Sequence, residues 1–302
     1  MPKIINFGSM NIDYVYNVPH IIIPGETLKT TERNVFAGGK GLNQSIAAAR
    51  AGASVIHAGS VGGEGGFLID LLKDAGADAS YVSKVSVPTG HTVIQVDENG
   101  QNSILFFAGA NVSFTEEYID KVLDTGNPGD FVLLQNETNM ISGIIEKAHA
   151  RDLKVVFNPS PFPEDLGCLP LESVDIFMVN EIEGALLAGA EGSISNNELL
   201  GVLSEKYPAA AIVMTLGTDG VIYSSGAKEF SCPAIKVNAV DTTAAGDTFC
   251  GYFLAGLCEG ICAADSLKLA TAASAIAVSR PGAVPSIPNR AEANELMKQS
   301  FT

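Results

Sequence analysis

Short apolar runs alternate with amphipathic segments along most of the chain. The apolar runs predict strands at residues 3–8, 54–61, 130–136, 154–157, 174–179 and 210–216. The 3.6-residue periodicity of the intervening segments predicts helices at residues 67–75, 115–124, 138–151, 181–188, 196–206, 244–258, 263–279 and 290–299. Strands that alternate with helices form βαβ units, so the pattern predicts an α/β fold with a mostly parallel sheet.

A second group of β-rich segments is not followed directly by helices. It comprises residues 14–18, 28–36, 81–85, 91–97 and 102–108. Segments 91–97 and 102–108 flank Asn99-Gly100, and an Asn-Gly pair between strands is a strong hairpin signal. We therefore expect these segments to form a small antiparallel sheet beside the main one.

Composition narrows the class of protein. A chain of 302 residues fits one large or two modest domains, and its 46% hydrophobic content includes no apolar run long enough to span a bilayer. The first residues lack the basic, apolar and cleavage regions of a signal peptide. The five cysteines show no CxxC pairing and several lie in apolar segments, which favours buried reduced thiols. We expect a cytoplasmic protein without a membrane partner.

The formal net charge is −16, from 18 basic and 34 acidic side chains. No basic patch is visible, which disfavours nucleic-acid binding. The overall acidity also repels phosphates, so any nucleotide site must depend on backbone amides, local cations and bound metal.

Residues 240–251 contain the most suggestive chemistry. Asp241 and Asp247 flank hydroxyl and small side chains, and an apolar helical pattern follows. The first turn of a helix offers unpaired N–H groups to an anion, and a carboxylate beside it can act as a general base. The alternative is an N-capping Asp on a core helix.

A glycine-rich turn precedes another predicted helix. In residues 37–44 the glycines allow close backbone access, and Lys40 and Asn43 are candidates to hold a polyhydroxylated ligand. The turn is not a Walker A loop, because Lys40 is followed by Gly41. Asn11 and Asp13, in the polar cluster after the first strand, are further candidate contacts or members of an Asx turn.

Two other polar segments are candidate cation sites. Asn180 and Glu183 follow a strand on one face of an opening helix turn, where an amide and a carboxylate can hold water-bound Mg²⁺ or simply cap the helix. The proline-interrupted loop 279–286 leaves carbonyls without ladder partners, which can coordinate a cation or meet water.

Three motifs together resemble the ribokinase, or PfkB, family of sugar and nucleoside kinases. They are residues 38–43 (GGKGLN), 180–183 (NEIE) and 241–247 (DTTAAGD), in the order typical of the family. The resemblance covers nearly the whole chain. It implies a single ribokinase-like catalytic domain over residues 1–302, folded as a three-layer α/β/α sandwich. The strands within residues 14–36 and 91–108 would form a lid over the sugar, and the lid would pair two subunits in a homodimer.

The resemblance also implies ATP-dependent phosphorylation of a primary hydroxyl. Asp247 would be the base, and the amides of Ala244, Ala245, Gly246 and Asp247 would form the anion hole. Asn180 and Glu183 would support Mg²⁺ through water. The nucleotide positions would be Asn180, Thr215, Gly217, Gly220 and Gly246. Potassium, implied as the monovalent cation, would be held by Asp241, Thr243, Ala277, Arg280, Gly282 and Ser286.

Within the family, the pattern is most similar to members that phosphorylate D-ribose. The positions implied to hold the sugar are Asn11, Asp13, Gly39, Lys40, Asn43, Glu137 and Asp247. The departures are residues 62–66, His91 on a lid strand, and the additional amide in residues 135–137. They leave open another acceptor, such as fructose or a nucleoside that stacks on Phe106 and Phe107, and a sugar-binding regulator without catalysis.

Overall fold

The central sheet has eight strands in the order β14-β13-β12-β11-β10-β9-β1-β4. The computed structural model describes the whole chain except residues 31, 164, 191, 193 and 302. The strands are β1 (Ile4–Phe7), β4 (Val55–Ala58), β9 (Phe131–Gln135), β10 (Lys154–Asn158), β11 (Ile176–Asn180), β12 (Ala211–Thr215), β13 (Val221–Ser225) and β14 (Lys228–Cys232). All neighbouring strands from β4 to β12 pair in parallel, whereas β13 and β14 add antiparallel pairings at one edge.

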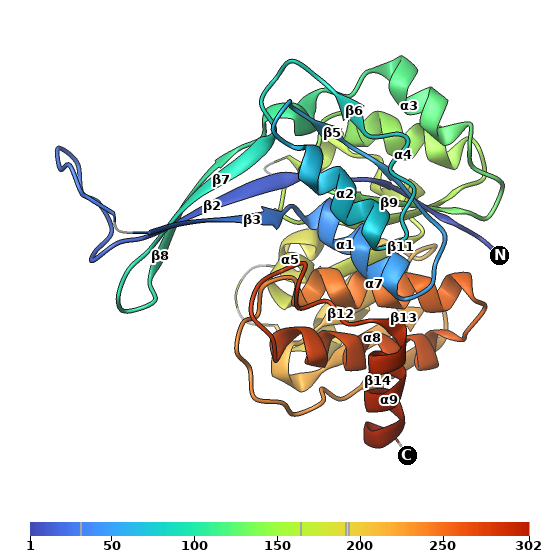
Figure 1. Cartoon of the computed structure of the whole chain (residues 1–302). Coiled ribbons are helices and arrows are strands. Elements are labelled where there is room, and N and C mark those ends of the chain that lie inside the picture. The colour runs from blue at the N-terminus through green and yellow to red at the C-terminus, as the bar shows by residue number, and fades with distance from the viewer. Residues whose placement is uncertain (31, 164, 191, 193, 302) are drawn as a thin grey trace.

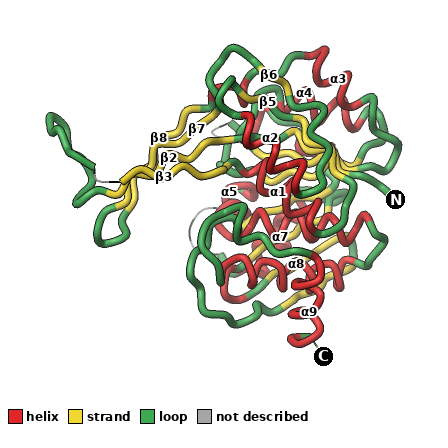
Figure 2. Tube along the Cα trace, in the orientation of Figure 1, coloured by secondary structure: helices red, strands yellow, loops and turns green. Residues whose placement is uncertain are grey.

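Helices cover both faces of this sheet, which confirms the predicted three-layer α/β/α architecture (Figures 1 and 2). On one face lie α1 (Lys40–Arg50), α2 (Gly66–Asp74), α7 (Ala245–Cys258), α8 (Ala263–Val278) and α9 (Arg290–Ser300). On the other lie α3 (Glu116–Leu123), α4 (Ile141–His149), α5 (Glu181–Ala188) and α6 (Asn196–Lys206). The sheet separates two hydrophobic cores, and successive strand residues point to opposite faces of the sheet. Ile4 therefore packs in the core beside α1, and Ile5 packs in the core beside α3.

A second sheet, the lid, projects away from the body (Figure 1). Its strand order is β3-β2-β7-β8, formed by β2 (Asn11–Asn17), β3 (Glu32–Gly38), β7 (Gly90–Val96) and β8 (Asn102–Phe107). The expectation of a purely antiparallel sheet is wrong, because β2 and β7 pair in parallel. The lid strands also begin elsewhere than expected, at Asn11 and Glu32, and position 31 of the expected strand 28–36 lies outside the described residues.

Segment 81–85 does not belong to the lid, contrary to expectation. Its short strand β6 (Ser83–Lys84) pairs with β5 (Ser60–Val61) on the body. The preceding Tyr81 and Val82 pack against the two cores of the body, which holds the segment there. Two other expectations also need correction. The strand predicted at 54–61 is divided into β4 and β5, and α4 begins at Ile141 because Met140 adopts a left-handed conformation with φ 60°.

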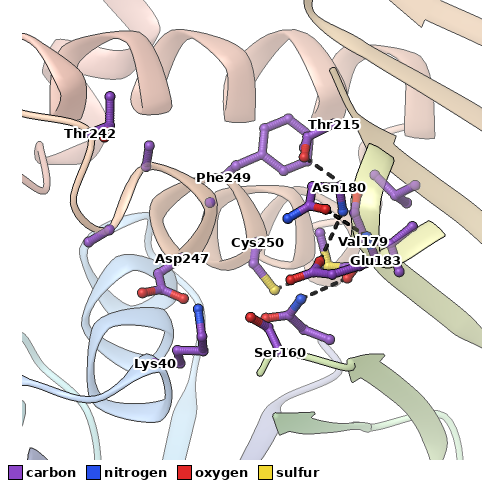
Figure 3. Close-up of a pocket in the computed structure, with 16 residues that line it drawn as sticks. Lys40, Ser160, Val179, Asn180, Glu183, Thr215, Thr242, Asp247, Phe249 and Cys250 are labelled. Carbon is purple, nitrogen blue, oxygen red and sulfur yellow. Dashed lines mark hydrogen bonds between the residues drawn. The ribbon is translucent and has the colours of Figure 1, made fainter. Parts of the chain in front are cut away.

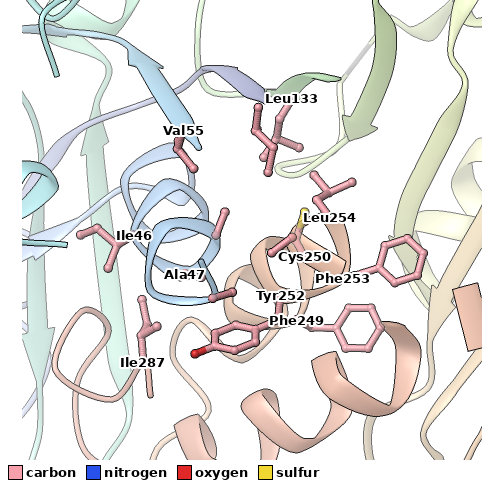
Figure 4. Close-up of a cluster of buried hydrophobic side chains, with 14 of the residues drawn as sticks. Ile46, Ala47, Val55, Leu133, Phe249, Cys250, Tyr252, Phe253, Leu254 and Ile287 are labelled. Atoms are coloured by element: carbon pink, nitrogen blue, oxygen red, sulfur yellow. The ribbon is translucent and has the colours of Figure 1, made fainter. Parts of the chain in front are cut away.

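Helices α1 and α7 approach closely across a cluster of buried side chains (Figure 4). The contact depends on Gly251, where an added Cβ would lie 2.5 Å from the Ala47 Cβ and 2.8 Å from the Gln44 carbonyl oxygen. Tyr252 and Phe253, on either side of the helix, are fully buried. The contact fixes the start of α7 against the start of α1, where two of the predicted motifs lie.

Within the described part of the chain, no helix is both long enough and apolar enough to cross a bilayer.

Replacing Gly251 by Ala should destabilise the protein by about 1–3 kcal/mol, because the new methyl overpacks the contact between α1 and α7. Urea unfolding followed by circular dichroism measures the change. The matched control is Gly201→Ala in α6, where an added Cβ meets no atom within 4 Å. That change should stabilise the helix by up to about 1 kcal/mol. Equal effects of the two substitutions would contradict this account of the contact.

Candidate active site

Two adjoining cavities, of about 270 and 680 Å³, lie where the parallel strands end. Asn158, Asn180 and Thr215 are the last residues of β10, β11 and β12, and all three line the smaller cavity. Figure 3 shows Lys40 and Asp247 across this cavity from Asn180 and Glu183. The two cavities share a wall made of Thr215, Thr242, Ala245, Gly246 and Phe249. The carboxyl edge of an open α/β sheet is the usual place for a ligand, and the sequence motifs converge there.

The turn before α7 exposes backbone donors to this shared wall. Ala244 is left-handed with φ 58°, and the first bond of the helix runs from the Thr248 N–H to the Ala244 carbonyl at 2.8 Å. The amides of Gly246 and Asp247 precede that bond, so they belong to the unpaired first turn. The Ala245 amide donates to the Thr242 carbonyl at 3.2 Å. An anion at this helix start would therefore meet the amides of Gly246 and Asp247 first.

The Asp247 carboxylate is 8% exposed and accepts hydrogen bonds from two neighbouring residues of α1. Asn43 Nδ2 donates to Oδ2 at 3.0 Å, and Gln44 Nε2 donates to Oδ1 at 2.9 Å. Lys40, at the start of the same helix, directs its amino group toward this carboxylate (Figure 3). An oriented carboxylate beside open amides and a cation can accept a proton from a hydroxyl next to a bound phosphate.

Gln44 was missed in the sequence analysis. The sequence offers only a polar residue between the apolar Leu42 and Ile46, and the structure shows that it is fully buried on α1. A buried amide in such a position requires partners, and Asp247 supplies one of them.

Asn11 and Asp13 lie on lid strand β2, not in the turn after β1 where the sequence placed them. Asn111 Nδ2 donates to Asn11 Oδ1 at 2.7 Å, and Thr92 Oγ1 donates to Asp13 Oδ1 at 2.6 Å. Desolvation raises the pKa of Asp13, and the bond from Thr92 offsets this only in part. Gly38 on β3 leaves room for this carboxylate, because a Cβ there would lie 2.1 Å from Asp13 Oδ2.

Glu137 lies against the first turn of α1. Its carboxylate accepts a bond from the Lys40 amide at 3.0 Å and another from the Ser9 hydroxyl. Desolvation raises the pKa of Glu137, and these two bonds counter the effect only partly. Gly39 precedes the helix with φ 97°. Nearby, Asn43 Oδ1 is buried and lacks a hydrogen-bond partner among the described residues.

Asn180 and Glu183 form a capping box at the start of α5. Asn180 Oδ1 accepts from the Glu183 amide at 2.8 Å, and Glu183 Oε2 accepts from the Asn180 amide at 3.0 Å. Both residues also line the smaller cavity. In the part of the chain that the structure describes, no group of three or more acidic, His or Cys side chains could hold a metal ion. A cation here would need oxygen ligands from water and from a bound phosphate, which suits Mg²⁺.

Asp241 ties the turn before α7 to the loop after α8. It accepts bonds from the Thr243 amide at 2.9 Å, the Thr243 hydroxyl at 2.6 Å and the Gly282 amide at 2.8 Å. Burial raises the pKa of Asp241, but these bonds together outweigh it and leave the pKa lowered. The other predicted cation positions are engaged locally: Arg280 pairs with Glu292, the Ala277 carbonyl accepts from the Arg280 amide, and the Ser286 hydroxyl donates to the Ala283 carbonyl.

The larger cavity is mostly apolar, and its lining includes Thr215, Gly217 and Gly220 as well as Gly246. The sequence analysis missed the opposite wall, which is formed by residues 234–237 and by Thr271 and Ser274 of α8. These wall residues carry no motif and come from two separate segments, so only the folded chain brings them together.

Comparison with known proteins places this architecture in a family. The profile described as pfkB family carbohydrate kinase matches residues 1–290. The chain is 34% identical to the ribokinase of Staphylococcus aureus (strain COL) over 97% of this chain and 99% of the relative. It is 35% identical to the ribokinase of Haemophilus influenzae, over 97% of each chain.

Solved structures show the same relationship. The ribokinase from Cryptococcus neoformans var. grubii serotype A, in complex with ADP, has a TM-score of 0.87 and 34% identity over 98% of this chain and 99% of that one. The Arabidopsis thaliana ribokinase, complexed with ribose and ATP, has a TM-score of 0.89 and 27% identity over 100% and 99% of the two chains. This chain belongs to the pfkB family of carbohydrate kinases and is an ATP-dependent sugar kinase.

Replacing Asp241 by Asn should destabilise the protein at pH 7 by about 1–2 kcal/mol. The carboxylate accepts hydrogen bonds from Thr243 on one oxygen and from Gly282 on the other, whereas an amide has a single oxygen and cannot accept from both residues. The native pKa lies below the unfolded value of about 3.9, so this stabilisation is present above about pH 4 and is lost as the pH falls through the native pKa. Urea unfolding at several pH values measures the difference between the two proteins, which should shrink in acid.

The control for this series is Asp70→Asn on the exposed side of α2, which should change stability by less than about 0.5 kcal/mol at every pH. A destabilisation by Asp241→Asn that stays constant down to pH 2 would contradict the assignment.

Proposed function

We propose that this kinase transfers the γ-phosphoryl group of ATP to the primary hydroxyl of D-ribose, forming ribose 5-phosphate. The observation that carries the proposal is the position of Asp247: it lines the smaller cavity at the wall shared with the larger one, beside the first-turn amides of α7. Relatives named ribokinase, 33–35% identical over nearly their full lengths, support ribose as the acceptor.

In this mechanism Asp247 removes the proton of the acceptor hydroxyl as the phosphoryl group arrives. The transferring group is held by the amides of Ala244, Ala245, Gly246 and Asp247. For this, the Ala245 amide gives up its hydrogen bond to the Thr242 carbonyl and donates to the phosphoryl group. Phosphoryl transfer depends on positioning and charge stabilisation. Lys40 adds a positive charge at the same place, which matters in a chain of net charge −16.

We place the sugar between the lid and the start of α1. Asn11 and Asp13 reach it from β2. Gly39, Lys40 and Asn43 reach it from the start of α1, and Glu137 from the turn after β9. The acceptor on Asn43 that has no partner among the described residues and the Asp13 oxygen that Thr92 leaves free support this placement. The lid and the body thus act as one catalytic unit spanning the whole chain.

We place ATP in the larger cavity, with Thr215, Gly217 and Gly220 along its wall and Asn180 and Gly246 near its phosphates. Mg²⁺ would neutralise the phosphate charge in the smaller cavity. Glu183 uses one oxygen in the capping box, and its other oxygen can hold metal-bound water.

A potassium ion would stiffen the anion hole from behind. Asp241 and Thr243 lie beside Gly282, and Ala277 near the end of α8, with Arg280 and Ser286 in the loop that follows, completes the proposed ligand set. We also propose a cytoplasmic setting, which the free thiols of all described cysteines support.

Another sugar or a nucleoside is the second candidate acceptor. His91 on β7 lies 5.1 Å from the Phe107 ring and 5.9 Å from the Tyr14 ring, between centroids, and its Nδ1 donates to the Thr89 carbonyl at 3.0 Å. Strand register puts these rings on the lid face opposite Asp13, whereas Phe106 lies on the face that carries Asp13 and is the ring that favours a planar base as ligand. A sugar-binding regulator without turnover is the third candidate.

A panel of acceptors decides between these candidates. D-ribose should give the highest kcat/KM in coupled ADP release, above 2-deoxyribose, fructose and adenosine, and should require Mg²⁺. Replacing sodium by potassium should raise the rate. Asp247→Asn should lower kcat by about 10²–10⁴ because the base is lost.

Equal ribose turnover by Asp247→Asn would exclude the proposed base, and a higher kcat/KM for adenosine would identify a nucleoside kinase. Calorimetric ribose binding without any ATP turnover would establish the regulator. A rate that is the same in potassium as in sodium would exclude the proposed potassium site without affecting the proposed base or acceptor.

We further propose that two copies of the chain dimerise through the lid. Strand register puts Ile104, Phe106 and Phe36 on the lid face that carries Asp13, and all three are 44–56% exposed. An apolar face of this kind on a projecting sheet is typical of an interface, and a second copy would cover it symmetrically.

Ile104→Asp should convert the dimer to a monomer, because it places a charge in the apolar interface. Analytical ultracentrifugation over a concentration series measures this. The matched control is Ser103→Asp, the adjacent exposed residue on the opposite face, which should remain dimeric. A wild-type chain that stays monomeric at every concentration would contradict the proposal.

A further inference from the structure

A chain of buried side-chain amides lies directly beneath Asp247. It runs from Gln44 on α1 to Gln135 at the end of β9 and then to Asn6 on β1. All three side chains are at most 1% exposed. Their hydrogen bonds join residues that are far apart in sequence. This series of amides ends at the Asp247 carboxylate, which we propose as the base.

The contacts form a continuous path. Asn6 Nδ2 donates to the Gly41 carbonyl at 2.8 Å, and Gln135 Nε2 donates to Asn6 Oδ1 at 3.1 Å. Gln135 Nε2 also donates to Gln44 Oε1 at 2.8 Å. Gln44 Nε2 then donates to Asp247 Oδ1 at 2.9 Å.

The path has a direction because it begins at a group that can only accept. The Gly41 carbonyl requires the nitrogen of Asn6, which turns the Asn6 oxygen toward Gln135. Gln135 must therefore present its nitrogen to both Asn6 and Gln44. The oxygen of Gln44 is engaged by that nitrogen, so its own nitrogen faces Asp247.

A second anchor enforces the same orientation independently. Asn158 Nδ2 donates to the Met178 carbonyl at 2.8 Å, which turns Asn158 Oδ1 toward Gln44. Gln44 Nε2 donates to that oxygen at 3.1 Å and uses its other hydrogen on Asp247. Both hydrogens and the oxygen of the Gln44 amide are thereby committed, and a flipped amide would oppose oxygen to oxygen at two places.

We propose that Gln44 is a positioning residue for Asp247, held in its donor orientation by the Asn6–Gln135 path and by Asn158. The proposal rests on Asp247 acting as the base of the kinase reaction. With Asn43 on one oxygen and Gln44 on the other, the carboxylate cannot rotate about its own axis. Its direction toward the acceptor hydroxyl is set by the folded core before any ligand binds.

The test is a kinetic comparison of variants in the full chain with D-ribose, ATP and Mg²⁺. Gln44→Met keeps the side-chain length but removes the donor, so kcat should fall by about 10–100-fold while the KM for ribose changes little, because a misdirected base slows chemistry without removing a sugar contact. Gln44→Glu, which opposes a second carboxylate to Asp247, should lower kcat further.

A double-mutant cycle separates the path from general destabilisation. Gln135→Met should lower kcat by a smaller factor, because Asn158 still anchors Gln44. In the Gln44→Met background, the same Gln135 change should have no further effect on kcat beyond about twofold, since its only route to Asp247 has gone. Independent losses that multiply in the double variant would overturn the proposal.

Ser45→Ala is the matched control. Ser45 is also buried on α1 and accepts from Asn6 Nδ2 at 2.8 Å, but Asn6 remains anchored by the Gly41 carbonyl without it. Its kcat should stay within about twofold of the wild type. A loss in this control equal to that of Gln44→Met would assign the effect to the core packing of α1, contrary to the proposal.

Two results keep this inference distinct from the proposed function. If Asp247→Asn abolishes turnover while Gln44→Met retains the wild-type kcat, only the positioning role is wrong. If Asp247→Asn retains turnover, the base itself is wrong. Should the Gln44 variants fail to fold, a neutron crystal structure of the unaltered chain decides: the Gln44 nitrogen must face Asp247, and an oxygen there would overturn the proposal.

Discussion

The contact between α1 and α7 is the constraint on which the site depends. Gly251 lets the helices meet without a side chain between them, and the two helix starts then bring Asn43 and Gln44 to Asp247. Each helix starts at a turn with a residue at positive φ, Gly39 before α1 and Ala244 before α7. A left-handed Ala is strained by about 1–2 kcal/mol relative to its usual conformation, and such strain is typical of functional turns.

The acidity of the chain explains why the site is built from backbone and amide donors. At a net charge of −16, long-range attraction cannot gather an anion, so short-range donors must hold it. In the proposed mechanism, the first-turn amides of α7 and the amino group of Lys40 serve that purpose locally. The carboxylates near the site are themselves tied by hydrogen bonds: Asp247 by two amides, Glu137 by Ser9 and Lys40, and Asp241 by Thr243 and Gly282.

The layered fold was predictable because its signals are local. Periodicity places most helices and the parallel strands, and the Asn99-Gly100 turn identifies the β7–β8 hairpin. Strand β14 was missed because its residues 228–231 are exposed and include Lys228 and Glu229, so it lacks an apolar pattern. Segment 81–85 was misplaced because its partner, β5, is two residues long and is separated from it by α2.

The candidate site was predictable to the extent that its residues fall in short motifs. From its sequence alone, the motif around Asn180 and Glu183 could be a helix cap or a metal site. The structure shows both hydrogen bonds of the cap, and both residues also line the smaller cavity. Gln44, Gln135 and Asn6 could not be joined from sequence, because their hydrogen bonds span up to 129 residues. The direction of that path depends on two carbonyl groups, Gly41 and Met178, that no side-chain pattern reveals.

The central claim is that Asp247 faces the acceptor hydroxyl across from the phosphate held at the start of α7. A crystal structure of the unaltered chain with D-ribose and a non-hydrolysable ATP analogue tests it most directly. We expect the primary hydroxyl of ribose within hydrogen-bond reach of an Asp247 carboxylate oxygen, about 2.6–3.2 Å, and the terminal phosphate at the amides of Gly246 and Asp247. A sugar bound with that hydroxyl directed away from Asp247, or a phosphate held elsewhere, would contradict the account.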